Sequence, residues 1–367
     1  MSTPNSPSKY SNPKNYPMVS VVIPVGGSRV KDVEKLTACV ESIANQDYPG
    51  EIEILLVVDP DNKTIKDLTF PGNVRFVDFH RLTVDKNRDT NARRKKGLMQ
   101  AKGEILGVTG VSMVFPKDTV AKAIALMNAW GVEAVDGVSV KMPDDNSFFA
   151  LFQDNALITE FPKYHKTFVL SRETMGEDQR MPCMTSFFIK RSAFDRVKSL
   201  IPVTSYAGWD DYNMARAIVE DGNVPILCAN ELVSYRNHRV TLRLGKQFTS
   251  GVSGMQFYLQ NRDNPYAQKR MKQAMIVASL ACFLFLAVAI GFAVYGPLSL
   301  LAWAGVGVVG LAGIGFLNYL KARFWQAFFF PPFMVIQVLL WVAGFLYTGI
   351  AEMQPDGDLI LLANKYR

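Results

Sequence analysis

The sequence has few cysteines and histidines, the residues that build zinc centres and disulfide scaffolds. Its 367 residues include four cysteines and three histidines, and the histidines are scattered without metal-ligand spacing. The cysteines are Cys39, Cys183, Cys228 and Cys282, and no two of them form a C-x-x-C motif. No G-x-G-x-x-G or Walker motif occurs either. These absences argue against a zinc module, a disulfide-stapled fold, a dinucleotide site and a P-loop NTPase.

The N-terminus lacks an apolar stretch. Residues 1–17 are rich in Ser, Pro and Asn, a composition typical of a disordered tail and unlike that of a signal peptide. The formal net charge is +7, a modest excess. It favours anionic lipids and phosphorylated substrates as partners, and we expect no nucleic-acid partner.

The C-terminal third, in contrast, is almost continuously apolar. From Ala274 to Ile350 only "YGP" at 295–297 and "KAR" at 321–323 interrupt it. Each of the three resulting segments meets the ~20 residues that a helix needs to cross a bilayer. We expect three transmembrane helices, 274–295, 297–320 and 324–350, although one re-entrant segment remains an alternative.

Flanking cations predict the orientation of these helices. "QKRMK" at 268–272 precedes the first apolar segment, and "KAR" at 321–323 separates the second from the third. The positive-inside rule then predicts that the N-terminal domain lies in the cytoplasm. We expect a multi-pass protein of the inner membrane. Three crossings leave the tail, residues 351–367, outside.

The N-terminal part alternates strands and helices. "MVSVVIPV" (18–25), "EIEILLVVDPD" (51–61) and "EILGVTG" (104–110) are typical of strands buried on both faces. Between them lie a helix with apolar residues at helical spacing and the basic helix "TNARRKKGLMQAKG" (90–103). The alternation predicts an α/β domain over 18–236 with a doubly wound, mainly parallel sheet, followed by an interfacial segment, 237–273.

Ligands of such sheets bind beyond the carboxyl ends of the strands. Pro24, Asp59, Asp61 and the loop 109–113 are therefore expected to line one crevice. The loop carries no acid, and the next one along the chain is Asp118.

Several motifs, in this order, resemble family 2 glycosyltransferases: "VSVVIPV", "ILLVVDPD", "NARRKKGLMQAKGEIL", "MPCMTSFFIKRSAFDRV", "GWDDYNMARAIVEDG" and "TLRLGKQFTSG". The resemblance covers about residues 20 to 350. It implies a GT-A fold and an inverting enzyme that uses a nucleotide-diphospho-sugar. The chain looks most like the bacterial exopolysaccharide type, similar to succinoglycan-synthesis glycosyltransferases with C-terminal membrane helices.

The resemblance also implies a donor site. Pro24 and Asp59 match positions that contact the base and ribose, while Asp61 is shifted from the usual second acid. Arg93 matches a residue that approaches the donor, and Lys86 lies on the segment that enters the same crevice. The metal-binding D-x-D motif falls on Gly110, Val111 and Ser112, so both of its acids are missing.

For the catalytic acids, the family's Glu-Asp motif falls on Asp210 and Asp211. These residues open an amphipathic helix, whose N–H groups and dipole favour ionised carboxylates. Asp211 is the candidate base. The alternatives are that both acids only cap the helix, or that Glu177 and Asp178 form the catalytic pair.

On the acceptor side, "QFTSG" falls where the family has Q-x-x-R-W or a relative of it. Gln247 is kept, next to Lys246, whereas Ser250 and Gly251 replace the Arg and Trp. Arg and Lys interleave there with apolar residues, which is typical of a segment at a membrane interface.

Two hypotheses follow for the missing acids. In the first, Lys86, Arg88, Arg93 and Arg94 neutralise the leaving diphosphate in place of Mg²⁺ or Mn²⁺, for which this loop offers no carboxylate. The chain then moves a sugar from its nucleotide donor to a membrane-associated, polyprenyl-linked saccharide in cell-surface polysaccharide synthesis. In the second, it is a degenerate glycosyltransferase-like domain that acts as a binding or scaffolding subunit.

Overall fold

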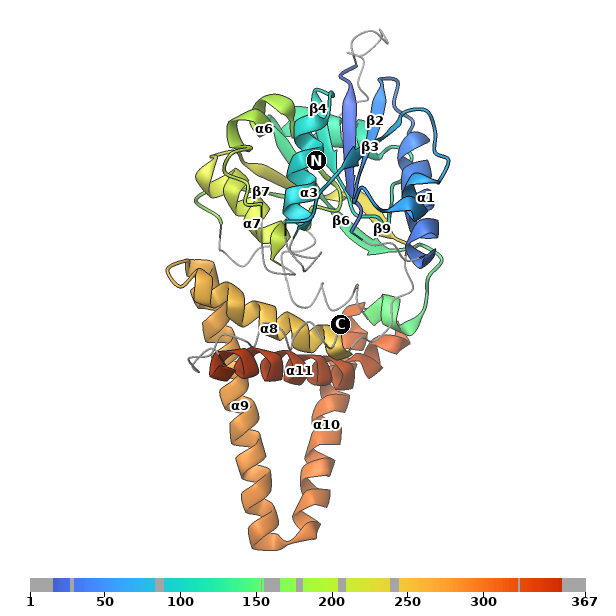
Figure 1. Ribbon diagram of the computed structural model, residues 1–367. Coiled ribbons are helices and arrows are strands. Elements are labelled where there is room, and N and C mark those ends of the chain that lie inside the picture. The colour runs from blue at the N-terminus through green and yellow to red at the C-terminus, as the bar shows by residue number, and fades with distance from the viewer. Residues whose placement is uncertain are drawn as a thin grey trace. The chain divides into compact units, whose positions relative to one another are not determined.

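A computed structural model describes residues 16–26, 30–82, 89–152, 154, 166–175, 181–203, 209–237, 244–322 and 324–351. The chain divides into two compact units (Figure 1). The first lies within residues 1–144, 163–205 and 210–238, and the second within residues 145–162, 206–209 and 239–367.

The first unit is built on one mixed sheet. Its parallel half has the order β3-β2-β1-β4 and consists of β1 (Val19–Pro24), β2 (Ile52–Val58), β3 (Val74–Asp78) and β4 (Ile105–Val108). The apolar runs that predict three of these strands are buried on both faces, as a sheet covered by helices on each side requires. The expected mainly parallel α/β sheet is thus confirmed.

Antiparallel strands extend the other half of the sheet. β8 (Phe187–Lys190) pairs with β4 on one side and with β6 (Ala134–Lys141) on the other, antiparallel to both. β9 (Ile226–Arg236) runs parallel to β6, and two short strands pair with β9: β5 (Met113–Val114) and β7 (Phe168–Leu170). The result is an open sheet that mixes a parallel half with antiparallel pairs.

Helices cover both faces of this sheet (Figure 1). Alternate residues of β1 show the division, since Val21 packs with α1 (Val30–Ala44) and α4 (Thr119–Trp130) and Val22 packs against the opposite layer. The opposite layer consists of α3 (Thr90–Gln100), α6 (Arg191–Val197) and α7 (Asp210–Arg216). The short α2 (Lys63–Lys66) follows β2, and a π-helical turn, Ala217–Asp221, continues α7.

Gly97 sets how closely α3 approaches the sheet. A Cβ at this position would overlap side-chain atoms of Val22 on β1 and Val57 on β2, the two inner strands of the parallel half. The glycine therefore lets the helix backbone lie directly on β1 and β2, which places the first turns of α3 beside the carboxyl ends of these strands.

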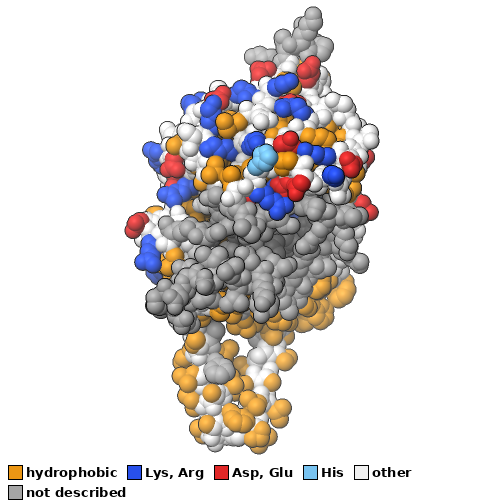
Figure 2. All heavy atoms as spheres, in the orientation of Figure 1, with side chains coloured by type: hydrophobic (Ala, Val, Ile, Leu, Met, Phe, Trp, Pro, Cys, Tyr) orange, Lys and Arg blue, Asp and Glu red, His pale blue; other side chains and the backbone are white. Residues whose placement is uncertain are grey.

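The second unit is helical. Its helices are α8 (Leu244–Gln260), α9 (Pro265–Tyr295), α10 (Pro297–Ala322), the 3₁₀ turn η3 (Trp325–Phe329) and α11 (Phe330–Ala351). Three stretches are long and apolar enough to cross a membrane, namely Pro265–Tyr295, Pro297–Leu320 and Trp325–Gly349. The expected three apolar helices are confirmed, and the first begins at Pro265 rather than at 274. Figure 2 shows mostly hydrophobic side chains on the α9–α10 hairpin.

The third apolar helix differs from the other two in its packing. α11 lies along α8 and crosswise to the α9–α10 hairpin (Figure 1). Glycines allow the close approach of α8 and α11, because a Cβ at Gly251 would overlap the carbonyl of Trp341 and one at Gly344 the carbonyl of Phe248. As a result, 28% of the most apolar part of the third stretch is buried, compared with 6% for each of the other two stretches.

Candidate functional site

Asp59 lies at the carboxyl edge of the parallel strands, directly after β2. Its side chain is nearly buried, and each carboxylate oxygen faces an arginine. Arg93 Nη2 donates to Oδ1 at 2.5 Å, and Arg81 Nε donates to Oδ2 at 2.8 Å. Burial alone would raise the pKa of Asp59, but the hydrogen bonds and charges of Arg81 and Arg93 outweigh it and hold the pKa below its ordinary value. Asp59 is therefore an ionised carboxylate in a fixed orientation.

The two arginines differ in exposure. Arg93 is 1% exposed, donates a second hydrogen bond to the Val25 carbonyl at 3.2 Å, and lies 4.4 Å from the centroid of the Phe79 ring. The side chain of Arg81 is 50% exposed. Arg93, which the sequence predicts near the donor, is thus held inside the domain as the partner of Asp59, and Arg81 is the cation at this position that reaches the surface.

A second acidic group lies at the start of α7. Arg94 Nη1 contacts Asp211 Oδ1 at 2.7 Å and Asp210 Oδ2 at 3.1 Å. Asn91 Nδ2 donates to the backbone carbonyl of Asp210 at 2.8 Å. Arg93 and Arg94 are adjacent on α3, and the ~100° between successive helical residues lets one serve Asp59 and the other serve the α7 acids.

Burial of its carboxyl group raises the pKa of Asp211 to about 7. The charge of Arg94 opposes this effect, and the charges of Asp210 and Asp136 add to it. The side chain remains 34% exposed. The helix start at Asp210 agrees with the sequence pattern, but the pKa of Asp211 is above that of a readily ionised carboxylate, because burial outweighs the charge and hydrogen bond of Arg94.

The loop between β4 and β5 contains Gly110, Val111 and Ser112, where the resemblance predicts the D-x-D motif. The Gly110 carbonyl accepts a hydrogen bond from the Met113 N–H at 3.1 Å, and the Ser112 carbonyl accepts one from the Asn237 N–H at 2.7 Å. Hard divalent ions prefer carboxylate oxygens, and this loop offers none. Over the described ranges, no group of three or more His, Cys, Asp and Glu side chains comes together to hold a metal ion. The loop residues do not fit a divalent metal.

The other predicted residues are distributed as follows. Pro24 ends β1, Asp61 is exposed in the turn after Asp59, and Gln247 lies on α8 in the second unit. Several lie outside the described residues, wholly or in their side chains: Lys86, Arg88, Glu177, Asp178 and the side chain of Lys246.

Sequence reasoning missed two residues of this site. Arg81 closely follows β3 in the sequence. Its position just beyond the carboxyl end of a strand could have predicted that it belongs to the site. Asp136 is fully buried on β6, where Oδ2 accepts from the Cys183 N–H at 3.0 Å. An acid inside the apolar run "EAVDGVSV" was its signal, because buried charges require partners.

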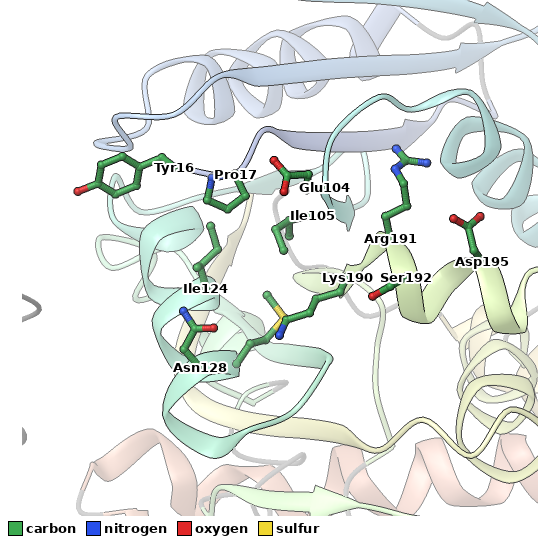
Figure 3. A pocket seen from close by; sticks show the side chains of 11 residues that line it. Tyr16, Pro17, Glu104, Ile105, Ile124, Asn128, Lys190, Arg191, Ser192 and Asp195 are labelled. Atoms are coloured by element: carbon green, nitrogen blue, oxygen red, sulfur yellow. The ribbon is translucent and has the colours of Figure 1, made fainter. Parts of the chain in front are cut away.

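A hollow of about 860 Å³ lies at the other edge of the sheet, at the amino ends of the parallel strands (Figure 3). It is lined by Ile105, the first residue of β4, and by Lys190, which pairs with it on β8. Glu104 and Arg191 line it as well. Arg191 donates to the backbone carbonyls of Gly103 and Ala101 at 2.8 and 2.7 Å. Because ligands of such sheets bind at the carboxyl edge, this hollow is not the candidate site.

Comparison with known proteins bears on the fold. Residues 20–198 match the family model described as glycosyl transferase family 2. The mannosyltransferase PcManGT from Pyrobaculum calidifontis, solved with GDP-Man and Mn²⁺, is 17% identical with a TM-score of 0.55. The alignment covers 92% of this chain and 89% of that one, and the likeness establishes a fold of the GT-A type.

A second solved structure, residues 1–349 of TarS from S. aureus, is 13% identical with a TM-score of 0.41, and the alignment covers 92% of each chain. This likeness is too distant to support an argument. No curated protein matches the chain.

Proposed function

Because residues 20–198 form a glycosyl transferase family 2 domain within a GT-A fold, we propose that the chain is an inverting glycosyltransferase with a nucleotide-diphospho-sugar donor. The observation that carries the proposal is the pair of carboxylate groups that α3 holds through Arg93 and Arg94. One is ionised, and the other has a pKa near neutrality.

Asp59 would bind the nucleoside of the donor. Each carboxylate oxygen has two lone pairs, so hydrogen bonds from Arg81 and Arg93 leave acceptor capacity for a ribose hydroxyl or a base N–H. The arginines fix the orientation of the carboxylate before the donor arrives, which lowers the entropic cost of binding. Pro24, Asp61, Gly110 and Ser112 complete the proposed donor site.

Asp211 would act as the base, with Asp210 beside it. Inverting transfer needs a group that takes the proton from the acceptor hydroxyl while its oxygen attacks the anomeric carbon. A base works best with a pKa near the operating pH, and the pKa of Asp211 is about 7. Arg94 holds both acids in place. The nucleoside diphosphate leaves from the opposite face of the sugar.

The leaving diphosphate requires positive charge. The 110–112 loop does not fit a divalent metal, so we assign this role to cations of the chain. Arg81 is half-exposed beside Asp59, and the basic segment with Lys86 and Arg88 follows it in the sequence. Arginine binds phosphate with two parallel hydrogen bonds, which suits this role.

The acceptor is proposed to be a membrane-associated, polyprenyl-linked saccharide of cell-surface polysaccharide synthesis. Support comes from the apolar α9 and α10 and from the cations that flank them, at 269–272 and 321–323. These cations favour a cytoplasmic location of the catalytic domain at the inner membrane. Gln247 and Lys246 lie on α8, which precedes α9 in the second unit.

A donor screen tests the proposal. Detergent-purified chain is mixed with UDP-, GDP- and dTDP-sugars, each with Mn²⁺ or with EDTA, and thermal stability is measured. We expect one nucleotide class to raise the melting temperature in both conditions, and Asp59→Asn to abolish the shift. No shift with any donor would instead support the scaffolding alternative.

A further inference from the structure

A pocket of about 500 Å³ lies within the second unit, where α8, α9 and α11 each contribute one face. Gly254 and Tyr258 line it from α8, Ala274 and Val277 from α9, and Val338 and Val342 from α11. These positions follow helical spacing, so the pocket is a property of the three-helix arrangement. Its volume is in the ~300–1,000 Å³ range of small-molecule sites.

One wall of the pocket is aromatic. Trp209 lines it and stacks on Phe257 with ring centroids 4.0 Å apart and planes 8° apart. Trp341 of α11 lines the pocket as well. Flat rings and branched aliphatic side chains give a surface that suits a hydrocarbon chain.

The polar lining has one sign. Arg270 is its charged member, three glutamine side chains accompany it (Gln247, Gln273 and Gln337), and none of the described residues that line the pocket is acidic. Arg270 is positioned by Tyr266, because its Nε donates to the tyrosine hydroxyl at 3.1 Å and its guanidinium lies 5.3 Å from the ring centroid. The lining therefore complements a molecule with a long apolar part and an anionic end.

The place of the pocket along α9 indicates where such a molecule comes from. Arg270 stands in the cationic run 269–272, and Ala274 and Val277 lie one and two turns further into the apolar helix. Cations at the end of an apolar span lie at the level of the lipid headgroups. An anionic group at Arg270 would thus be at headgroup depth, with its hydrocarbon beside the membrane-spanning part of α9.

We propose that this pocket binds one membrane lipid, with its phosphate at Arg270 and its hydrocarbon chain along Val277, Val338 and Val342. On the basis of the proposed function, this lipid is the isoprenoid anchor of the sugar acceptor. Trp209, which lines the pocket, directly precedes Asp210 in the sequence.

Tryptophan fluorescence tests the pocket without any donor, since Trp209 and Trp341 line it. The full chain, in phosphatidylcholine nanodiscs, is titrated with farnesyl phosphate, with farnesol and with inorganic phosphate. We expect a saturable change with farnesyl phosphate, at least ten-fold weaker binding of farnesol, and no change with inorganic phosphate. Equal binding of farnesol and farnesyl phosphate would overturn the assignment of Arg270.

Variants place the site on the chain. Arg270→Gln should weaken farnesyl phosphate binding at least ten-fold, and Arg270→Lys should retain most of it. Lys272→Gln removes the same charge two residues away on an exposed side chain that does not line the pocket, and should leave binding unchanged. If Lys272→Gln weakens binding as much as Arg270→Gln, the phosphate is attracted by general surface charge and the proposal is wrong.

The bulky variant Val277→Trp should block the hydrocarbon part of the pocket and reduce farnesol and farnesyl phosphate binding together. Nucleotide binding, measured on every preparation, serves as the folding control. A chain that binds nucleotide but no lipid contradicts the pocket alone. A chain that binds lipid but no nucleotide contradicts the proposed transferase function alone.

Discussion

Arg93 and Arg94 follow one another on α3, and their side chains go to different acids. Arg93 is buried between Asp59, the Val25 carbonyl and the Phe79 ring. Arg94 joins Asp210 and Asp211. A buried arginine that holds a carboxylate acts through that carboxylate, so we regard both arginines as positioning residues.

Asp211 is predicted to control the pH dependence of transfer. Its pKa is raised to about 7, so the carboxylate form that accepts a proton becomes populated as the pH rises through about 7, and the rate should rise with it. The folded state also holds this proton more tightly than the unfolded chain, so this group destabilises the fold as the pH rises from about 4 to 7. Rate profiles from pH 5 to 9 measure the first effect.

Substitution identifies the group. Asp211→Asn should lower transfer by at least ~10² while donor binding is kept, and Asp221→Asn, an exposed acid at the end of the same helical stretch, should change neither. Near-normal transfer by Asp211→Asn, with loss of transfer on substitution of Glu177 or Asp178, would show that the catalytic pair is the other one.

Arg81 is predicted to bind the donor diphosphate. Charged hydrogen bonds of this kind contribute ~1.5–3 kcal/mol, so Arg81→Ala should weaken nucleotide-diphosphate binding about ten-fold or more. Arg93→Ala should weaken it too, and should also destabilise the fold by ~3 kcal/mol because the buried Asp59 loses one of its two partners. Calorimetry measures binding, and thermal unfolding separates the two effects.

The control for this pair is Lys66→Ala, which removes the cation of the Lys66–Asp78 pair at the neighbouring strand and should leave binding unchanged. Chelation with EDTA should alter the affinity little, because the 110–112 loop supplies no carboxylate. A large loss of affinity with EDTA would show that a metal is held by other acids of the site.

Among the elements, α8 and α11 pack closely, and small residues make this possible. Gly251 and Gly344 each face a backbone carbonyl of the other helix, with no room for a Cβ. Close backbone approach through glycine is characteristic of helices that pack in membranes. The pair also forms two walls of the lipid pocket.

Gly344→Ala is therefore predicted to be destabilising. The added methyl would overlap the Phe248 carbonyl, and overpacking of this kind costs ~1–3 kcal/mol. Gly310→Ala, on α10, meets nothing within 4 Å and should be neutral or slightly stabilising. Thermal unfolding in detergent compares the two variants, and equal effects would contradict the close packing of α8 on α11.

At the scale of the whole molecule, the flanking cations predict which side of the membrane each end of the apolar helices faces. Cations at 269–272 and at 321–323 flank the α9–α10 hairpin at both of its open ends. Protease added to sealed right-side-out vesicles should spare residues 1–272, and it should digest them in inverted vesicles. Digestion from the outside would reverse the proposed orientation.

The side of the membrane on which the tail, residues 351–367, lies depends on whether α11 crosses the bilayer. α8 has 17 residues, short of the ~20 that cross a bilayer, and α11 packs along it. We therefore expect α11 to lie along the membrane surface with α8. Ile360→Cys, in a Cys183→Ser and Cys282→Ser background, should then react with an impermeant maleimide only from the inside. Labelling from the outside would support the three crossings that apolarity alone predicts.

Local sequence pattern is sufficient for much of the fold. The buried strands β1, β2 and β4, the helix α3 and the apolar helices all follow from periodicity and from long uniform runs, which act over neighbouring residues. The same holds for the absence of acids at 110–112, and for the start of α7 at Asp210. The order of the motifs was enough to predict the match of residues 20–198 to the glycosyl transferase family 2 model.

Tertiary structure decides which of these residues meet. Arg81 and Arg93 reach Asp59 from two other elements, and the charge of Asp136 on β6 acts on Asp211 of α7. The pKa of Asp211 and the packing of α11 on α8 likewise depend on tertiary structure. Burial and charge pairing depend on distances between segments far apart in the chain, and the order of strands and the crossing of helices set those distances.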